Sequence, residues 1–311
     1  MPAPIALFAY CRPVHLSRII DALRRNLEAR DSHLYVFCDA AKNPAAQQGV
    51  DAVRDLLRDV EGFSEVNIVR REKNYGLAKN ITTGVTEVLQ QHPNVVVVED
   101  DVLVAPHFLR FMNDALTLYR HEPRVGSVSG YCYPVVRPLP ETFFIKGADC
   151  WGWATWRDRW VLYNSDGVQL LDELNARRLE YTFDFDGTMG FTQMLKDQIT
   201  GKNDSWAVRW HASCFLRDRL ILYPCRSLVE NIGHDGSGTH AKARDHSYDV
   251  QVSMAPVGIG GIEVEESEIG RAAFCDFFRR SQGLGSFKDE MPSTVRGTFM
   301  RMLNSTLKWM G

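Results

Sequence analysis

The sequence predicts an α/β fold in which a mostly parallel central sheet of the Rossmann-like class is flanked by helices. Between residues 5 and 98, short apolar segments typical of strands alternate with longer segments in which apolar residues recur at helical spacing. The last of these strands contains four consecutive valines at positions 95–98, and such a run suits a strand that is buried on both faces. Alternation of this kind is typical of parallel sheets with helices on both sides.

Seven elements account for this first part of the chain. The pattern predicts strands at residues 5–10, 33–38, 66–69 and 95–98, and helices at residues 14–27, 45–60 and 77–91. In an open α/β sheet, ligands bind in the crevice at the carboxyl ends of the strands. We therefore expect one crevice to be lined by the residues that follow three of these strands, which are Cys11, Arg12, Asp39, Glu99, Asp100 and Asp101.

The pattern is less regular along the rest of the chain. A helix is expected from residue 107 to residue 119, followed by strands at residues 125–128 and 142–145. From about residue 147 the sequence is irregular, aromatic and glycine-bearing, and from about residue 241 it lacks clear periodicity. We therefore divide the chain into residues 1–146, 147–240 and 241–311, and we expect the third segment to wrap or cap the second.

Three adjacent acids, Glu99, Asp100 and Asp101, directly follow the valine run. Carboxylates this close repel one another unless a cation lies nearby, and their hard oxygen atoms are suitable ligands for a divalent metal ion. A metal ion that carries a phosphorylated ligand would meet this need, whereas the alternative is a solvated acidic cluster at the exit of a strand. The first strand is not followed by a GxGxxG sequence, so a dinucleotide redox cofactor is not indicated.

The composition is that of an ordinary globular protein. Hydrophobic residues make up 45% of the 311 residues and charged residues 24%, and the formal net charge of −3 offers no general attraction for nucleic acid. The seven cysteines include no CxxC pair, which argues against a zinc module or a full disulfide framework. Because no signal peptide or membrane span is evident, we expect a cytoplasmic protein.

The last residues carry a second pattern. Residues 295–310 combine apolar side chains with Arg296, Arg301 and Lys308 at amphipathic spacing. Such a segment would either dock on the core of the protein or lie on the inner face of a membrane as a peripheral anchor.

Four segments resemble the GT-A glycosyltransferases, in the same order along the chain. VVVVEDDVLVAPHFLRFM at residues 95–112 looks like the metal-binding segment, with EDD as its form of the DxD motif, and YGLAKN at residues 75–80 resembles the helix start that precedes it. VSG at residues 128–130 resembles the next strand, and CWGWATW at residues 150–156 resembles the glycine-aromatic segment of the acceptor half. The resemblance is greatest to the N-acetylglucosaminyltransferase I group and to related bacterial sugar transferases.

The resemblance implies a GT-A fold and assigns roles to several residues. Residues 1–146 would bind a nucleotide sugar, and residues 147–240 would form the acceptor and catalytic half. Asp101 would be the direct ligand of Mn²⁺ or Mg²⁺, with Asp100 nearer the ribose or sugar hydroxyls and Glu99 in support.

Three other residues match positions that hold the nucleotide in the resembled group. Asp39 would contact the base, Arg12 would lie near the base or the phosphates, and Asn80 would be a further polar contact. The residues themselves leave simpler roles open. Asp39 could cap the following turn, Arg12 could be a surface charge, and Asn80 could face solvent from its helix.

The segment NDSW at residues 203–206 resembles the one that carries the catalytic base of inverting members. This makes Asp204 the group that deprotonates the acceptor hydroxyl, and two nearby tryptophans, Trp206 and Trp210, would partly desolvate it and raise its pKa. The family pattern has a second acid where this chain has Ser205, and a helix N-cap is the alternative role of Asp204. Two other acids are candidates for the base, Asp149 and Asp197.

A late loop and two tryptophans complete the candidate site. The glycine-bearing segment at residues 231–240 suits a loop that closes over a diphosphate. The resemblance points to His240, or alternatively His234, as a histidine that reaches the metal ion or the phosphates. Trp151 or Trp153 could stack on the donor sugar, although most large rings of this kind lie in a core.

The leading hypothesis is a metal-dependent, inverting glycosyltransferase. It would transfer a sugar such as N-acetylglucosamine or another hexose from a UDP-sugar to a hydroxyl of a saccharide or lipid-linked saccharide acceptor, in surface polysaccharide or glycan synthesis. One alternative is a sugar nucleotidyltransferase, which ordinarily has a glycine-rich basic segment where this chain has YCRP at residues 10–13. Another is a non-catalytic protein that binds nucleotide sugars or glycans. The oligomeric state is left open.

Overall fold

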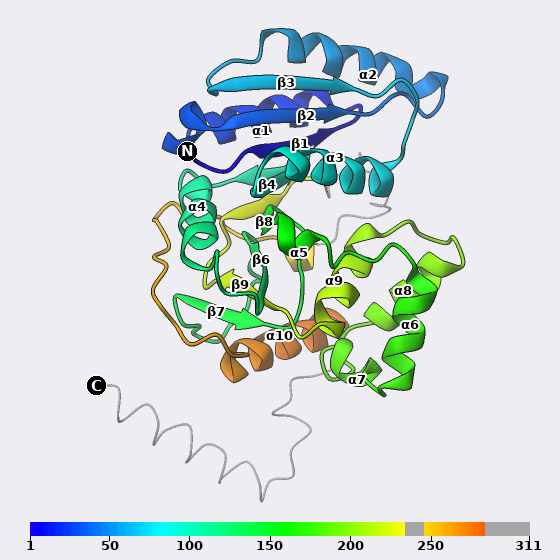
Figure 1. The fold of residues 1–311 in the computed structure, drawn as a ribbon, viewed down its shortest axis with the longest axis vertical. Helices are drawn as coiled ribbons and strands as arrows, with labels where there is room; N and C mark the ends of the chain where they lie inside the picture. Colours follow the sequence, from blue (N-terminus) through cyan, green and yellow to red (C-terminus); the bar gives the residue numbers. More distant parts are fainter. Residues whose placement is uncertain (234–245, 284–311) are drawn as a thin grey trace, which may run out of the picture.

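A computed structural model of the chain describes residues 1–233 and 246–283 (Figure 1). In this part of the chain, eight strands form one central sheet, in the order β3 (Glu65–Arg70), β2 (His33–Cys38), β1 (Ile5–Ala9), β4 (Asn94–Glu99), β8 (Trp153–Trp156), β6 (Val125–Ser129), β9 (Leu220–Pro224) and β7 (Thr142–Ile145). Only β8 and β7 run antiparallel to their neighbours. The predicted α/β class with a mostly parallel sheet is therefore confirmed.

The first half of the sheet forms from the predicted elements. Its strands are connected by α1 (Pro13–Arg24), α2 (Pro44–Leu56) and α3 (Leu77–Gln91). The first two helices end earlier than predicted because short 3₁₀ helices follow them, at Leu27–Asp31 and Leu57–Asp59. Asn26 holds the end of α1, since its side-chain amide donates to the carbonyl oxygens of Ala22 at 3.0 Å and Ala105 at 3.1 Å.

The valine run lies at the centre of the core, as predicted. All four side chains are fully buried. Val96 and Val98 pack in one cluster with α1 and α4 (Phe108–Leu118), whereas Val95 and Val97 pack on the other face of the sheet with α3 and α9 (Trp206–Leu216). Because β4 is also paired with β1 and β8, its four valines are shielded from water, and only Asn94 and Glu99 at its ends are partly exposed.

The sequence pattern did not predict β8, although this strand lies near the middle of the sheet. It runs antiparallel to β4, with Val97 opposite Trp153 and Asn94 opposite Trp156. All of its side chains are buried, so its sequence has no apolar-polar alternation by which a strand is recognised. Residues from the second half of the chain thus complete the sheet that the first half begins.

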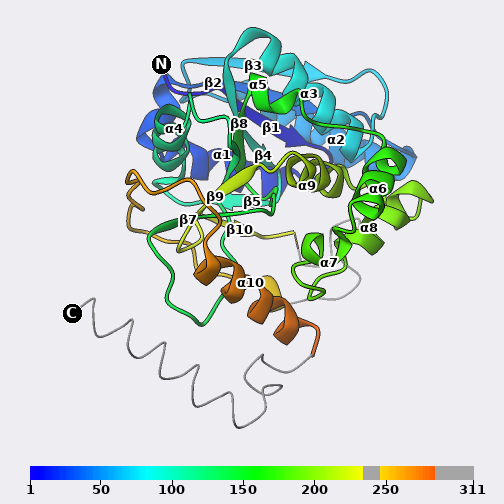
Figure 2. The same cartoon turned by 60° about the horizontal axis from the view of Figure 1, so that its bottom comes forward.

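The other elements surround this sheet. Helices α6 (Gly167–Ala176), α7 (Glu180–Phe183) and α8 (Phe191–Ile199) gather beside α9 in both views (Figures 1 and 2). Two short strands, β5 (Val102–Val104) and β10 (Val229–Asn231), form an antiparallel pair, and α5 (Arg157–Trp160) follows β8 directly. Helix α10 (Glu268–Ser281) packs against β7.

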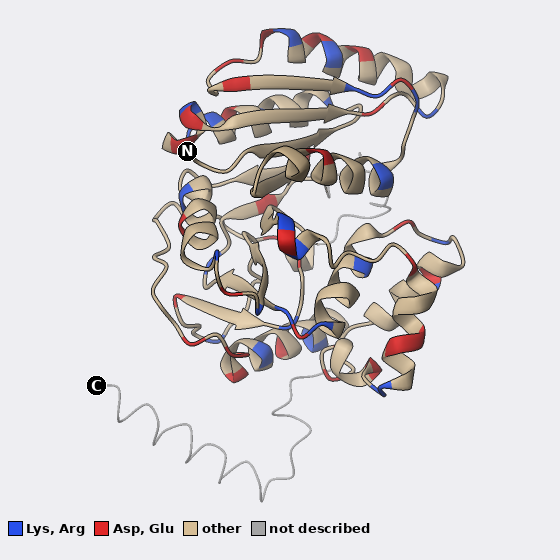
Figure 3. Ribbon diagram, viewed as in Figure 1, with Lys and Arg blue, Asp and Glu red and all other residues tan. Residues whose placement is uncertain are grey.

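Charged residues lie mainly on helices and loops, and the strands carry few of them except at their ends (Figure 3). Within the described ranges, no helix is long and apolar enough to cross a membrane. The amphipathic pattern expected at residues 295–310 lies outside the residues that the structure describes.

We expect Trp153→Ala to destabilise the chain strongly. The Trp153 ring is fully buried against the rings of Trp160, Trp206 and Trp210, with centroid distances of 5.5–6.0 Å. Its loss should leave a cavity and lower the free energy of unfolding by about 3–5 kcal/mol, measured by urea denaturation. Val161→Ala, at a side chain that is 75% exposed, is the matched control and should change stability by less than about 0.5 kcal/mol.

Candidate functional site

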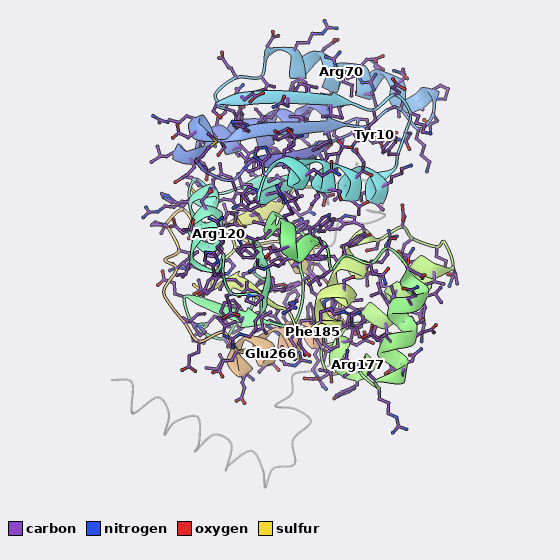
Figure 4. The ribbon with its side chains drawn as sticks, in the orientation of Figure 1. Tyr10, Arg70, Arg120, Arg177, Phe185 and Glu266 are labelled. Atoms are coloured by element: carbon purple, nitrogen blue, oxygen red, sulfur yellow. The ribbon has the colours of Figure 1, made fainter. Side chains whose placement is uncertain are left out.

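The candidate site lies at the carboxyl ends of the parallel strands. Figure 4 places Tyr10, which follows β1, and Arg70, which ends β3, toward the same edge of the sheet, whereas Arg120 lies on the opposite side. Glu99 ends β4 at this edge, opposite Phe8 of β1. The predicted convergence of these strand ends is therefore present in the fold.

One arginine bridges two of the three adjacent acids. Nη2 of Arg12, at the start of α1, lies 2.9 Å from Oδ2 of Asp101 and also contacts Oδ1 of Asp100. The backbone amide of Tyr10 donates to the other oxygen of Asp100 at 3.1 Å. Burial tends to lower the pKa of Arg12, but the charges of Asp100 and Asp101 outweigh it and raise that pKa above its usual value. Arg12 is thus not a free surface charge.

Arg12 neutralises only part of the negative charge of the three acids. Burial raises the pKa of Glu99 well above its ordinary value, and the charges of Asp101 and Asp100 raise it further, while Arg12 offsets only part of this. Burial also raises the pKa of Asp100. Asp101 remains accessible, with 22% of its side chain exposed. A second cation beside these carboxylates would relieve the remaining repulsion.

The donor set fits a divalent metal ion, although the described residues do not hold a preformed cluster for one. No group of three or more His, Cys, Asp or Glu side chains within residues 1–233 and 246–283 is arranged to hold a metal. Carboxylate oxygens are nevertheless the hard ligands that Mg²⁺ and Mn²⁺ take. A metal ion would have to displace Arg12, at least in part, from Asp101 and Asp100.

Residues 231–233, late in the chain, lie against these acids. The amide of Ile232 donates to the carbonyl oxygen of Asp101 at 2.8 Å, directly after β10 pairs with β5. Gly233 lies so close that a Cβ atom there would be 2.6 Å from Oδ2 of Asp101. This places the start of the predicted loop at the acids. His234 and His240, its candidate ligands, lie outside the described residues.

Asp39 caps the turn before α3, whereas the simpler of its two predicted roles is to cap the turn that directly follows β2. Its buried carboxylate accepts hydrogen bonds from the amides of Tyr75 at 2.8 Å and Gly76 at 2.9 Å, and from the side chain of Asn74 at 3.1 Å. These bonds fix the glycine turn of the YGLAKN segment beside the end of β2. Contact between Asp39 and a nucleotide base stays a prediction.

Asn80 is buried and does not face solvent. It accepts a hydrogen bond of 3.0 Å from Nε of Arg71, a residue that the sequence analysis did not single out. The guanidinium of Arg71 also lies over the rings of Phe37 and Tyr75 and contacts Glu87, yet its Nη2 has no hydrogen-bond partner among the described residues. Its position directly after β3 was the signal that could have identified it.

Asp204 lies at the N-terminus of α9, where Ser205 is the residue that caps the helix. The expected desolvation of Asp204 is wrong, because its side chain is 66% exposed and forms an ion pair of 3.1 Å with Arg209. Two tryptophans that were expected to cover it turn into the core instead, Trp206 and Trp210. Asp197, another candidate base, pairs with Lys202 on the surface of α8.

Trp151 and Trp153 lie in different environments. Trp153 is fully buried in the core, so its side chain has no surface to offer a sugar. Trp151 is only partly buried and lies edge-on to the rings of Tyr131 and Tyr248, at centroid distances of 4.7 and 6.1 Å. Gly152 between them has a φ of +61°, which turns the chain from the site into β8.

No protein-family model matches the chain, and no curated protein matches its sequence. Solved structures with partial similarity include TarS of S. aureus (15% identity, 45% of this chain and 23% of that chain, TM-score 0.30) and a UDP-glucose pyrophosphorylase in complex with UDP-glucose (13%, 71% and 90%, 0.38). A third is a cytidylyltransferase from Leptospira borgpetersenii (12%, 52% and 63%, 0.34). The chain thus spans less than a quarter of TarS and less than two thirds of the cytidylyltransferase.

If Asp101 binds Mn²⁺ as the sequence predicts, Gly233→Ala should weaken that binding. The added Cβ would lie 2.6 Å from Oδ2 of Asp101 and 3.1 Å from Nη1 of Arg12, so one of these groups must move. A misfit of this size corresponds to a decrease of about tenfold or more in affinity, measured by titration of Mn²⁺ in the presence of UDP. Gly261→Ala, where a Cβ meets nothing within 4 Å, is the control. Equal affinities of the two variants would contradict the prediction.

A buried histidine behind the site should make stability depend on pH. His211 lies between the rings of Phe183 and Phe191, and its Nδ1 accepts from the amide of Ala148 at 3.2 Å. Burial lowers the pKa of His211 from 6.5 to about 4. The unfolded chain therefore binds more protons between these values, and the free energy of unfolding should fall by about 3 kcal/mol as the pH drops from 6.5 to 4.

Urea denaturation at several pH values between 4 and 6.5 measures this fall in the free energy of unfolding. His211→Asn removes the titrating group but keeps an acceptor near the amide of Ala148, so its stability should vary less with pH than that of the wild type. His121→Asn, at an exposed position, should keep the wild-type profile. Parallel profiles for His211→Asn and the wild type would show that this histidine is not the cause.

Proposed function

We propose that the chain is a metal-dependent glycosyltransferase that moves a sugar from a UDP-sugar to a hydroxyl of a saccharide acceptor. The observation that carries this proposal is the cluster of Glu99, Asp100 and Asp101 at the carboxyl end of β4, bridged by Arg12 from the end of β1. A site of this kind suits a diphosphate together with a cation, and it lies where open α/β sheets bind nucleotides. The GT-A resemblance of the sequence supports the same proposal.

Two carboxylates of the cluster would hold the cation, Asp101 directly and Asp100 beside it. A bound Mn²⁺ or Mg²⁺ supplies charge neutralisation for the departing diphosphate. Arg12 would then share its charge with a phosphate oxygen, because it lies at the N-terminus of α1, where the helix dipole also favours an anion. Asp100 would also lie nearer the ribose or sugar hydroxyls, with Glu99 in support.

The nucleoside would lie toward β2 and β3. Asp39 and Asn74 fix the turn before α3 there, and the ring of Tyr75 is covered by Arg71 and Lys79. Nη2 of Arg71, which has no hydrogen-bond partner in the part of the chain that the structure describes, is a donor that a carbonyl oxygen of a pyrimidine base would satisfy. This arrangement supports UDP over a ligand without a base.

Transfer by a single displacement would invert the anomeric carbon. The acceptor oxygen attacks that carbon as the bond to the diphosphate breaks, and a carboxylate receives the hydroxyl proton. The resemblance gives this role to Asp204. The acceptor would be a saccharide, free or lipid-linked, of a surface polysaccharide or another glycan, and a cytoplasmic location with peripheral membrane contact would suit such an acceptor.

We expect nucleotide release from one UDP-sugar, and not from GDP-, CMP- or dTDP-sugars, that requires Mn²⁺ and is abolished by chelator. Asp101→Ala should lower this rate by at least about 100-fold, because one ligand of the cation is lost. Asp114→Ala, an exposed acid of α4, is the matched control and should keep the wild-type rate. The assay measures the nucleotide that each donor releases, which is UDP, GDP, CMP or dTDP.

Two outcomes would overturn the proposal. Formation of a nucleotide sugar from a nucleoside triphosphate and a sugar phosphate, without donor hydrolysis, would identify a nucleotidyltransferase. A thermal shift with UDP and Mn²⁺ but no turnover of any donor would identify a binding protein of the same fold.

A further inference from the structure

Asp149 lies at the same edge of the sheet as the three acids, on the acceptor side. It begins the short segment that leads into β8, and β8 is the antiparallel neighbour of β4. With Val97 opposite Trp153, this segment runs beside the residues that end β4. Asp149 and Glu99 both act on the buried thiol of Cys150, since their charges add to burial in raising its pKa.

The carboxylate of Asp149 is held in a fixed orientation. The hydroxyl of Tyr133 donates to its Oδ2 at 2.8 Å, and the amide of Trp151 donates to its Oδ1 at 3.0 Å. Its own amide donates to the hydroxyl of Tyr223 at 3.1 Å, and that hydroxyl donates in turn to the carbonyl oxygen of Gly147 at 2.6 Å. The amide of Cys150 also acts on this carboxylate, and together with Trp151 and Tyr133 it offsets part of the effect of burial on the pKa of Asp149.

The surroundings of Asp149 differ from those of Asp204. Asp149 is partly buried at a small hollow that is also lined by Tyr133, Ala148, His211 and other residues. Burial raises its pKa, and none of the ion pairs found within the described residues involves it. Asp204, by contrast, is largely exposed and is paired with Arg209. A carboxylate without a cationic partner is the stronger base.

The side chains beside Asp149 also suit a sugar. Trp151 is only partly buried and lies edge-on to Tyr131 and Tyr248. Tyr133 packs on Phe274 and Phe278 of α10, which fixes the hydroxyl that holds Asp149. A polar group on an aromatic wall is the common form of a saccharide site, because sugar rings offer both hydroxyls and apolar C–H faces.

We infer that Asp149, and not Asp204, is the catalytic base of the transfer, an inference that rests on the proposed function. The acceptor O–H bond breaks and its proton passes to an oxygen of Asp149, while the acceptor oxygen forms a bond to the anomeric carbon. The bond from that carbon to the diphosphate breaks, and its electron pair leaves with UDP. Tyr133 acts as a positioning residue for the carboxylate.

The test uses the full chain, Mn²⁺ and the UDP-sugar that the wild type hydrolyses, with water as the acceptor. Asp149→Asn should lower the rate of UDP release by about 100-fold to 10,000-fold while leaving the affinity for UDP within about twofold. Asp114→Asn is the control and should match the wild type. Tyr133→Phe, which removes one hydroxyl only, should lower the rate about fivefold and serves as the second variant if Asp149→Asn does not fold.

Azide distinguishes a base from a residue that merely supports the fold. It needs no deprotonation, so it can attack the anomeric carbon of the donor in Asp149→Ala, with UDP as the leaving group. We expect azide to restore UDP release by this variant at least about tenfold, with formation of a glycosyl azide of inverted configuration, and to have little effect on the wild type. Azide should not rescue Asp101→Ala, which lacks a group needed by the leaving diphosphate.

The outcomes separate this inference from the proposed function. Near-wild-type turnover by a folded Asp149→Asn protein, or a large loss in Asp204→Asn that azide rescues, would overturn the role of Asp149 and leave the glycosyltransferase proposal intact. A folded Asp149→Ala protein with low activity that azide does not restore would show that Asp149 is not the base and has only a structural role. No turnover of any UDP-sugar by the wild type would refute both proposals.

Discussion

The electrostatic balance between three adjacent carboxylates and one arginine is the constraint on which the site depends. Glu99, Asp100 and Asp101 follow a strand that is sealed on both faces, so their charges are not screened by water on the strand side. Arg12 reaches two of them only because β1 lies directly beside β4. The parallel pairing of β1 with β4 thus supplies the positive charge that offsets part of the repulsion among the three acids.

The second half of the chain completes the site through the same sheet. Because β8 inserts between β4 and β6, the segment from Asp149 to Gly152 is brought to the end of β4. The backbone there is fixed by the bond from the amide of Gly130 to the carbonyl oxygen of Gly152, at 2.7 Å. One continuous sheet therefore positions the three acids at the end of β4 and Asp149 before β8 at the same edge.

Several acids of this chain differ in chemistry although their residue type is the same. The carboxylate of Asp39 accepts hydrogen bonds from backbone amides, and Asp204, which is largely exposed, forms an ion pair with the buried guanidinium of Arg209. Asp101 is accessible and shares its arginine with Asp100, whereas Asp149 is held by Tyr133 and the amide of Trp151, and no cation of residues 1–233 or 246–283 forms an ion pair with it. Burial, hydrogen bonds and neighbouring charges decide which carboxylate can bind a metal ion and which can take up a proton.

The sequence by itself determined the alternation of strands and helices, the buried valine strand and the position of the acids at its end, because these follow from periodicity and from neighbours along the chain. It did not determine β8, whose side chains are buried on both faces and show no alternation. It also could not decide the environments of Asp39, Asn80, Trp153 and Asp204. Only the tertiary structure decided those, because exposure and hydrogen bonding depend on contacts such as Arg12 with Asp100 and Tyr133 with Asp149, between residues that the fold brings together.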